Sequence, residues 1–379
     1  MARENGMNMR LAEGVRPRWG KAAAAVAAAG VICLAEAGPA MAIDSGGVVD
    51  CRHNPNALQP ALANARPGAT LRIKGVCFGN FVINTDLKLI GLDGAVLDGH
   101  DTGTTVTVNN ARVELKSLTI IHGQADSGGG ISNNNGSVTL DDSTVRNNNV
   151  SQGGGGIDNT NGTVTLIKST VRNNTANGAF GFGGGINSFN GTVTLDHSKV
   201  SNNFANGLGG GIENSHTTLK LDGSTVSNNS SGEVGGIDTF NKSSVTLTDS
   251  TVRKNSSTTD SGGILVEHTN GSVTLHNSRV VDNSAGTDGG GIYNQSATTL
   301  KGSTVSGNIA GRFGGGIYNG ILGGVRGSLT VRDSTVERNT AFQDGGGIYN
   351  LGTVTLRDSK VRDNHPNNCA PTPIPGCKQ

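Results

Sequence analysis

The chain has 379 residues and a formal net charge of +1; 60 residues are glycine and only 3% are aromatic. A charge this close to balance gives no basic field, which argues against nucleic acid as a partner. High glycine without proline enrichment, combined with the regular spacing described below, favours an ordered repeat over a disordered chain.

Residues 1–42 have the organisation of a secretory signal. Residues 16–21 form a basic segment, residues 22–35 an apolar segment too short to span a bilayer, and residues 40–42 (Ala-Met-Ala) a small-x-small cleavage site. We therefore expect a mature chain that begins at Ile43, is secreted or held in the cell envelope, and has no transmembrane segment.

Residues 43–68 are expected to cap the N-terminal end of the structure that follows. Within them, the segment 56–68 predicts a short helix with Leu58 and Leu62 on one face, ended by the Pro-Gly pair at 67–68. The open end of a solenoid is an exposed sheet edge, so such a cap prevents edge-to-edge aggregation.

Four of the five cysteines remain after removal of the signal, an arrangement that fits an oxidising compartment. Cys51 and Cys77 lie near the start of the predicted solenoid, and Cys369 and Cys377 lie near its end. Among the three possible connectivities, pairing within each end is the simplest. Residues 365–379 are thus expected to form a Pro-rich tail closed by a disulfide.

Residues 69–364 contain a repeat. After irregular opening coils, each copy has an Ile that follows a Gly run and, further on, a Ser-x-Val-x-x-Asn segment. Between them, apolar and hydroxyl residues alternate with period two, which predicts β-strands and excludes helical repeats. The steps between copies, 25 to 31 residues, are too short for propeller blades. The nine marker isoleucines are Ile131, Ile157, Ile186, Ile212, Ile237, Ile264, Ile292, Ile317 and Ile348.

These features predict an all-β fold, a right-handed parallel β-helix of about 11–12 coils with three short strands in each coil. One Asn in each copy falls at an equivalent turn, where stacked amides can bond from coil to coil and where Asn tolerates a left-handed backbone. We interpret this column, and the Ser column beside it, as scaffold rather than catalytic machinery. Its members are Asn148, Asn174, Asn203, Asn229, Asn255, Asn283, Asn308, Asn339 and Asn364.

Two copies carry insertions with apolar residues, one at 179–182 before Ile186 and one at 320–327 after Tyr318. Apolar loop tips on a solenoid are candidate contact sites. The alternative is that they fold over a neighbouring coil.

The repeats resemble those of a known family. Gly314-Gly315-Gly316-Ile317, after a strand with Val305 and Asn308, is similar to the repeats of polymorphic outer membrane proteins. The segments 87–91 (Leu-Lys-Leu-Ile-Gly) and 95–99 (Ala-Val-Leu-Asp-Gly) resemble the opening coils of secreted β-helix proteins of the pectin-lyase-like superfamily. The resemblance covers residues 56–364 and implies the fold. It implies no single function, because the superfamily includes lyases, hydrolases and adhesins.

The residue after each marker Ile is expected to point outward, and here the copies differ. Asp158, Glu213 and Asp238 occupy this column, the last two on adjacent coils about 4.8 Å apart. Carboxylates at such spacings suit glycoside hydrolysis or a cation site for an acidic sugar. The alternative is that they are three acids on a solvated face, since the nearby basic residues are only His216 and Lys242. No metal site and no cofactor are predicted.

The same column holds all three tyrosines of the chain, Tyr293, Tyr318 and Tyr349, on its last three coils. Such an aromatic strip can bind a sugar ring or a partner, or it can simply stabilise the strands by stacking. A second outward face carries a two-wide array of hydroxyls that resembles ice-binding β-helices, although exposed strands favour Thr in any case. The array comprises Ser137/Thr139, Thr163/Thr165, Thr192/Thr194, Ser244/Thr246, Ser272/Thr274, Ser328/Thr330 and Thr353/Thr355.

Together these patterns favour a secreted or cell-envelope scaffold with a non-catalytic binding or adhesion role, towards glycans or other cell-surface components. Two alternatives remain open. One is a polysaccharide lyase or glycoside hydrolase that acts through the outward acids; the other is an ice-binding threonine array. A monomer is compatible with the sequence, which does not define the oligomeric state.

Overall fold

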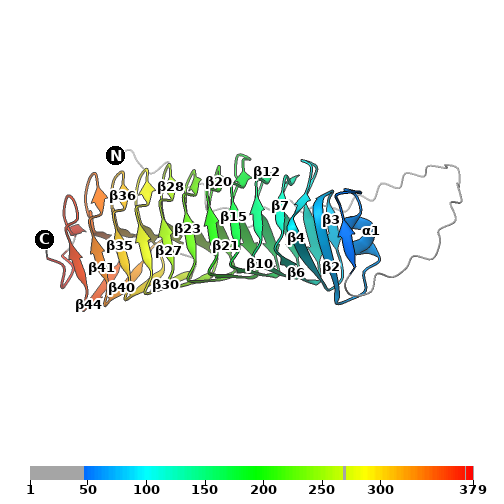
Figure 1. The fold of residues 1–379 in the computed structure, drawn as a ribbon. Helices are drawn as coiled ribbons and strands as arrows, with labels where there is room; N and C mark the ends of the chain where they lie inside the picture. The colour runs from blue at the N-terminus through cyan, green and yellow to red at the C-terminus, as the bar shows by residue number, and fades with distance from the viewer. Residues whose placement is uncertain (1–46, 268–269, 372, 379) are drawn as a thin grey trace, which may run out of the picture. The chain divides into compact units, whose positions relative to one another are not determined.

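A computed structural model describes residues 47–267, 270–371 and 373–378; the predicted signal and its cleavage site lie outside them. The described chain is a right-handed parallel β-helix of about 12 turns, as the sequence predicts (Figure 1). Each strand pairs in parallel with its equivalent one coil away, so that Val138 lies beside Val164 and Leu140 beside Leu166. Like residues therefore stack in columns along the helix axis.

A regular coil contains four strand segments rather than the three that we expected. In the first regular coil the additional segment is the two-residue strand that directly follows Asn148, because the chain turns at Asn147 and residues 149 and 150 pair again. The four segments contribute to three sheets, of 23, 12 and nine strands.

The 12-stranded sheet contains the strands that begin, in the regular coils, at the marker Ile. Its members are β3 (Phe81–Ile83), β5 (Val106–Asn109), β9 (Ile131–Asn134), β13 (Ile157–Thr160), β17 (Ile186–Phe189), β21 (Ile212–Ser215), β25 (Ile237–Phe240), β29 (Ile264–Val266), β33 (Ile292–Asn294), β37 (Ile317–Asn319), β43 (Ile348–Asn350) and β46 (Cys369–Pro371).

The 23-stranded sheet takes two strands from each regular coil. The two series of strands count as one sheet because the long strands at its N-terminal end span both positions. It opens with β1 (Val48–Asp50), β2 (Ala69–Phe78) and β4 (Leu87–Asp98). Its five-residue strands are β6 (Arg112–Lys116), β10 (Ser137–Asp141), β14 (Thr163–Ile167), β18 (Thr192–Asp196), β22 (Thr218–Asp222), β26 (Ser244–Thr248), β30 (Ser272–His276), β34 (Ala297–Lys301), β40 (Ser328–Arg332) and β44 (Thr353–Arg357). Its three-residue strands are β7 (Thr119–Ile121), β11 (Thr144–Arg146), β15 (Thr170–Arg172), β19 (Lys199–Ser201), β23 (Thr225–Ser227), β27 (Thr251–Arg253), β31 (Arg279–Val281), β35 (Thr304–Ser306), β41 (Thr335–Glu337) and β45 (Lys360–Arg362).

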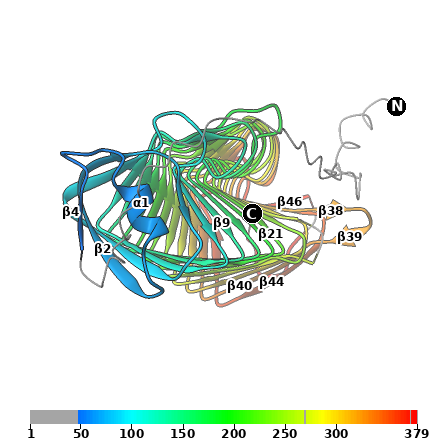
Figure 2. The same cartoon turned by 90° about the vertical axis from the view of Figure 1, so that its right-hand side faces the viewer.

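The nine-stranded sheet is formed by the two-residue segments. They are β8 (Gln124–Ala125), β12 (Asn149–Val150), β16 (Thr175–Ala176), β20 (Phe204–Ala205), β24 (Ser230–Ser231), β28 (Ser256–Ser257), β32 (Ser284–Ala285), β36 (Ile309–Ala310) and β42 (Thr340–Ala341). The insertion at 320–327 forms a separate antiparallel hairpin of β38 (Ile321–Leu322) and β39 (Val325–Arg326), which stands out from the coils in Figure 2.

Three corners of a regular coil are made by residues with a left-handed backbone. In the first regular coil these are Asn135, Asp142 and Asn147, with φ of 56°, 50° and 56°. Asn and Asp tolerate this region better than other residues that carry a Cβ. We expected Asn148, the Asn that recurs in every repeat, to take the left-handed position. Instead the residue before it does, and the Asn148 side chain is buried.

The core is filled by the columns of Ile, Val and Leu that face the coil interior, such as Ile131, Val138, Leu140 and Val145, all fully buried. The inward Asn column forms a continuous hydrogen-bonded ladder. Asn148 Nδ2 donates to Asn174 Oδ1 at 2.9 Å, and the Asn148 backbone N–H donates to the same oxygen at 3.1 Å. Each Asn side chain thus accepts a hydrogen bond from the backbone N–H at the turn of the coil before it.

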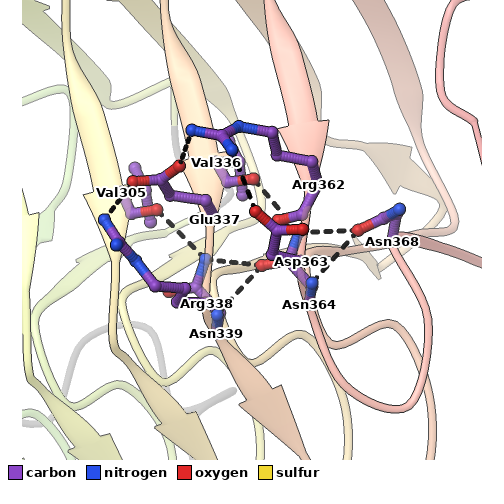
Figure 3. Close-up of polar contacts among 9 residues, drawn as sticks. All are labelled: Val305, Val336, Glu337, Arg338, Asn339, Arg362, Asp363, Asn364 and Asn368. Carbon is purple, nitrogen blue, oxygen red and sulfur yellow. Dashed lines mark hydrogen bonds and ion pairs between the residues drawn. The ribbon is translucent and has the colours of Figure 1, made fainter.

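At the C-terminal end the ladder continues beyond the repeats (Figure 3). Asn339 Nδ2 donates to Asn364 Oδ1, and Asn364 Nδ2 donates to Asn368 Oδ1, each at 3.0 Å. Beside it, the largely buried carboxylate of Glu337 contacts both Arg338 and Arg362. The sequence pattern did not reveal Asn368, because it follows Asn364 by four residues instead of one repeat.

A second polar column lies two residues after the marker Ile and was not predicted. Asn133 Nδ2 donates to Asn159 Oδ1 at 2.7 Å, and near the other end Asn294 bonds Asn319 at 2.7 Å and Asn319 bonds Asn350 at 2.8 Å. The Ile-x-Asn spacing that repeats in these coils is the sequence signal that would have identified it.

Both ends of the solenoid are covered on one side. The helix α1 (Leu58–Ala63) buries Leu58 and Leu62 as predicted, but it is shorter than the expected segment, because the chain turns from Asn64 onward. The cysteines pair within each end, Cys51 with Cys77 and Cys369 with Cys377, which is the simplest of the three connectivities. At the C-terminal end, β46 adds a last strand to the 12-stranded sheet.

Candidate functional site

The residues that follow the marker isoleucines form one column along the 12-stranded sheet. Asp158 pairs with Asn187, Asn187 with Glu213, and Glu213 with Asp238. The column continues through Leu265 to the three tyrosines. The structure therefore places Glu213 and Asp238 on adjacent coils and the tyrosines on the last three regular coils, the arrangement from which both site predictions were argued.

The acids of this column do not lie on a solvated face, which corrects our expectation. Asp158 is 8% exposed, Glu213 7% and Asp238 0%. Asn187 Nδ2 donates to Asp158 Oδ1 at 2.5 Å, and Thr160 Oγ1 donates to Asp158 Oδ2 at 3.3 Å. These carboxylates are therefore not directly accessible to a polysaccharide that approaches this part of the sheet.

In each regular coil, a loop that leads from the nine-stranded sheet into the Gly run covers the column of residues after the marker Ile. We call it the covering loop. In one coil Leu208, which ends this loop, packs against an apolar cluster that contains the column residues Leu265 and Tyr293. Further along, Val234 from the same loop packs with Leu265 and Tyr293 in a small apolar cluster outside the main core. The alternation within the strand predicts correctly that the column faces away from the coil interior, but the loop converts this outer face into a second interior.

The tyrosines become less buried toward the C-terminal end. Tyr293 is 8% exposed, and both Tyr318 and Tyr349 are half-buried. Burial raises the pKa of the Tyr293 phenol well above its usual value and that of Tyr318 to about 12, and burial also raises the pKa of Tyr349. Their ring centroids lie 4.6 Å apart for Tyr293 and Tyr318, at 68°, and 5.4 Å apart for Tyr318 and Tyr349, at 10°.

A residue from the covering loop completes this aromatic group. Phe313, which directly precedes the Gly run of its coil, stacks on Tyr349 with centroids 4.4 Å apart and an interplanar angle of 27°. We call Phe313, Tyr318 and Tyr349 the aromatic cluster. All three are half-buried, so part of the cluster reaches the surface. Sequence reasoning missed Phe313; the signal was its fixed place before the Gly run, a column that also contains Asp288 and Asp344.

Charged groups border the aromatic cluster. Arg312 contacts the carboxylate of Asp288, which is 4% exposed, and the guanidinium carbon lies 5.7 Å from the centroid of the Phe313 ring. Burial raises the pKa of Asp288, although the Arg312 contact acts against that shift. Asp344 accepts hydrogen bonds at Oδ1 from Asn367 Nδ2 at 2.7 Å and from the Gly345 backbone N–H at 2.9 Å.

The two insertions do not fold fully over the neighbouring coils. Phe180 is 82% exposed, whereas the adjacent Phe182 is half-buried and bridges the loops of Gly153 and Leu208. In the hairpin, Ile321 is 39% and Val325 is 47% exposed. One anchor holds the hairpin to the next coil, a hydrogen bond of 2.9 Å from the Arg326 Nη1 to the Leu351 carbonyl.

The hydroxyl array lies in register on the outer face of the 23-stranded sheet, but Lys220 and Ala297 interrupt its two columns. The adjoining outward column carries charged residues such as Asp222, Lys301 and Arg332. A surface with these charges is not a uniform hydroxyl plane, and ice binding is not supported.

Within the described residues, no group of three or more His, Cys, Asp or Glu side chains is arranged to hold a metal ion. The helices among those residues also lack the length and apolar character needed to cross a membrane.

The comparisons with known proteins give a likeness of fold. No family model and no curated protein matches the sequence. Among solved structures, the chain is similar to the crystal structure of pectate lyase Pel9A, with 14% identity and a TM-score of 0.49, over 86% of this chain and 82% of that one. At this level of similarity nothing about activity follows for this chain.

Proposed function

We propose that this protein is a secreted or cell-envelope β-helix that binds glycans without cleaving them, through the aromatic cluster at its C-terminal end. The observation that carries the proposal is a contrast in access along one column. The candidate acids Asp158, Glu213 and Asp238 are at most 8% exposed, whereas Tyr318 and Tyr349 reach the surface. Both intramolecular disulfides support an oxidising, extracytoplasmic location.

The chemistry of the cluster suits a sugar. Aromatic rings provide apolar area for the C–H groups of a pyranose, and phenol hydroxyls and carboxylates bond its hydroxyl groups. Phe313, Tyr318 and Tyr349 supply the rings, and Asp344 supplies a carboxylate fixed by two hydrogen bonds. Two strands and two covering loops hold these groups, so little order has to be gained on binding.

A glycan array combined with detection of reaction products tests the proposal on the full chain. We expect a bound glycan and no cleavage. The variant Tyr349→Ala should weaken binding by roughly 1–2 kcal/mol, the usual range for an aromatic contact residue. The matched variant Glu213→Gln, in a covered part of the same column, should leave affinity unchanged.

Product release that stops in Glu213→Gln or Asp238→Asn would instead establish the lyase or hydrolase reading. Binding that does not change in Tyr349→Ala would remove the aromatic cluster as the site.

A further inference from the structure

The covering loops build one complete cation site from the protein's own residues. The guanidinium of Arg312 reaches back one coil to the Asp288 carboxylate and lies against the ring of Phe313, 5.7 Å from its centroid. The Phe313 backbone N–H donates to Asp288 Oδ1 at 3.2 Å and fixes the carboxylate in place. A carboxylate beside an aromatic ring is a favourable environment for a cation, because the charge and the ring quadrupole both attract it.

The next coils repeat this arrangement without the cation. Asp344 lies in register with Phe313, whose ring stacks on that of Tyr349, and the charge of Asp344 acts on the Tyr349 phenol, so that an acid again lies near an aromatic ring. The regular repeats end here, and the tail places the neutral amide of Asn367 on Asp344 Oδ1. Among the described residues, Asp344 Oδ2 receives neither a hydrogen bond nor an ion pair.

The electrostatics around Tyr349 are negative. After burial, the charges that raise the pKa of the Tyr349 phenol are those of Asp344 and Asp288, and Asp260 contributes in the same direction at Tyr318. Among the described residues, Arg312 is the cation whose charge opposes this shift at Tyr318, and its guanidinium is bound to Asp288. An anionic glycan would be repelled here, and a cationic one attracted.

We infer that Asp344 and Tyr349 bind the protonated amine of an amino sugar, so that the glycan ligand is a cationic, glucosamine-type polymer. The inference rests on the proposed glycan-binding function and specifies its ligand class. The sugar amine takes the place beside Asp344 and Tyr349 that Arg312 takes beside Asp288 and Phe313. The sugar ring and its hydroxyls then meet Phe313 and the phenol groups.

Isothermal titration calorimetry of the full chain tests the inference, with a β-1,4 glucosamine hexamer as probe and its N-acetylated, neutral counterpart as matched ligand. We expect the cationic hexamer to bind more tightly, and its advantage to disappear above the pKa of the sugar amine. Asp344→Asn keeps the shape and removes the charge, and should weaken the cationic hexamer roughly tenfold or more while it leaves the neutral one nearly unchanged.

Two further variants sharpen the result. Asn367→Lys places an internal cation beside Asp344 and should exclude the cationic hexamer as effectively as Asp344→Asn does. Asp358→Asn is the matched control, because Asp358 is exposed, occupies a left-handed corner that Asn tolerates, and lies outside the covering loops; its affinity should equal that of the wild type.

Equal affinity for both hexamers, or no effect of Asp344→Asn, would overturn the amino-sugar inference and leave glycan binding standing. Absence of binding to any glycan would overturn both. Polylysine that binds at Asp344 while the glucosamine hexamer does not would show that the site takes a basic protein segment, and would also overturn the inference.

Discussion

The asparagine ladder makes a quantitative prediction about stability. Asn255, 1% exposed, accepts at Oδ1 from the backbone N–H of Asn229 at 3.0 Å and from its Nδ2 at 2.9 Å. Its own Nδ2 donates to Asn283 Oδ1 at 3.0 Å and to the Val226 carbonyl at 3.1 Å. Asn255→Ala removes all four hydrogen bonds in a place that water does not reach.

The cost follows from which groups keep another partner. Asn229 Nδ2 still bonds the Val200 carbonyl, and Asn283 Oδ1 still accepts from the backbone N–H of residue 255. The Asn229 backbone N–H retains none, and an orphaned buried donor costs about 1–3 kcal/mol. With about 0.5–1.5 kcal/mol for each of the three other lost bonds, Asn255→Ala should destabilise the protein by roughly 2.5–7.5 kcal/mol.

Urea unfolding followed by circular dichroism measures this loss, and hydrogen exchange of the Asn229 amide localises it. Asn364→Ala, at the half-buried end of the ladder, should cost only about 1 kcal/mol, because water replaces its contacts. Asn177→Ala, an exposed Asn whose side chain makes no hydrogen bond within the described chain, should cost less than about 0.5 kcal/mol. If Asn255→Ala and Asn177→Ala unfold at the same urea concentration, or if Asn255→Ala leaves hydrogen exchange of the Asn229 amide unchanged, the ladder does not stabilise the turns.

Three further predictions concern the aromatic cluster, the Gly runs and the first insertion. The unfolded tyrosines ionise near pH 10.0, whereas the pKa of Tyr318 is about 12 and that of Tyr349 is also raised. The folded state therefore holds protons that the unfolded state releases, so stability is fully present below pH 10.0 and falls as the pH rises toward 12. A phenolate absorbance titration of the folded chain that shows all tyrosines ionising near pH 10.0 would contradict this. Gly156→Ala should lower the melting temperature strongly, because its Cβ would lie 2.6 Å from a carbonyl of the next coil; an unchanged melting temperature would show that the coils can separate at no cost. Phe180→Ser should leave the melting temperature unchanged and Phe182→Ser should lower it, because only Phe182 is packed; equal effects would refute the assigned exposures.

The column after the marker Ile has a register that the sequence predicts and a burial that it does not. Its register, one residue for each coil, follows from the sequence, because equivalent residues of equal repeats must align when strands pair in parallel. Its burial does not follow. Asp238 and Thr246 are both polar residues at outward positions of alternating strands, yet Asp238 is fully buried and Thr246 is not. What differs is the covering loop, whose path depends on contacts between coils and not on the strand itself.

The aromatic cluster shows the same limit. The tyrosines could be placed on one column from their spacing, and their stacking is the outcome that identical residues in register favour. Phe313 and Asp344 could not be joined to them, because both lie on a different segment of the coil. Phe313 stacks on Tyr349, and Asp344 lies in register with Phe313, only because that segment folds back over the column. The sequence therefore predicted the tyrosines of the candidate site but neither Phe313 nor Asp344, the residue that carries its charge.

By itself the sequence determined the parts of this protein that depend on neighbours along the chain and on strict repetition. These are the β-helix, its inward columns of Ile, Val and Leu, and the asparagine ladder from Asn148 to Asn364; for the cysteines the sequence favoured pairing within each end as the simplest of three connectivities, and the structure has that pairing. Tertiary structure alone decided which residue of each corner is left-handed, which outer face is covered, and that Asp344 ends beside Tyr349. Alternation along a strand fixes only to which side a residue points. Whether that side meets water or another segment depends on the packing of loops between coils, which no local pattern encodes.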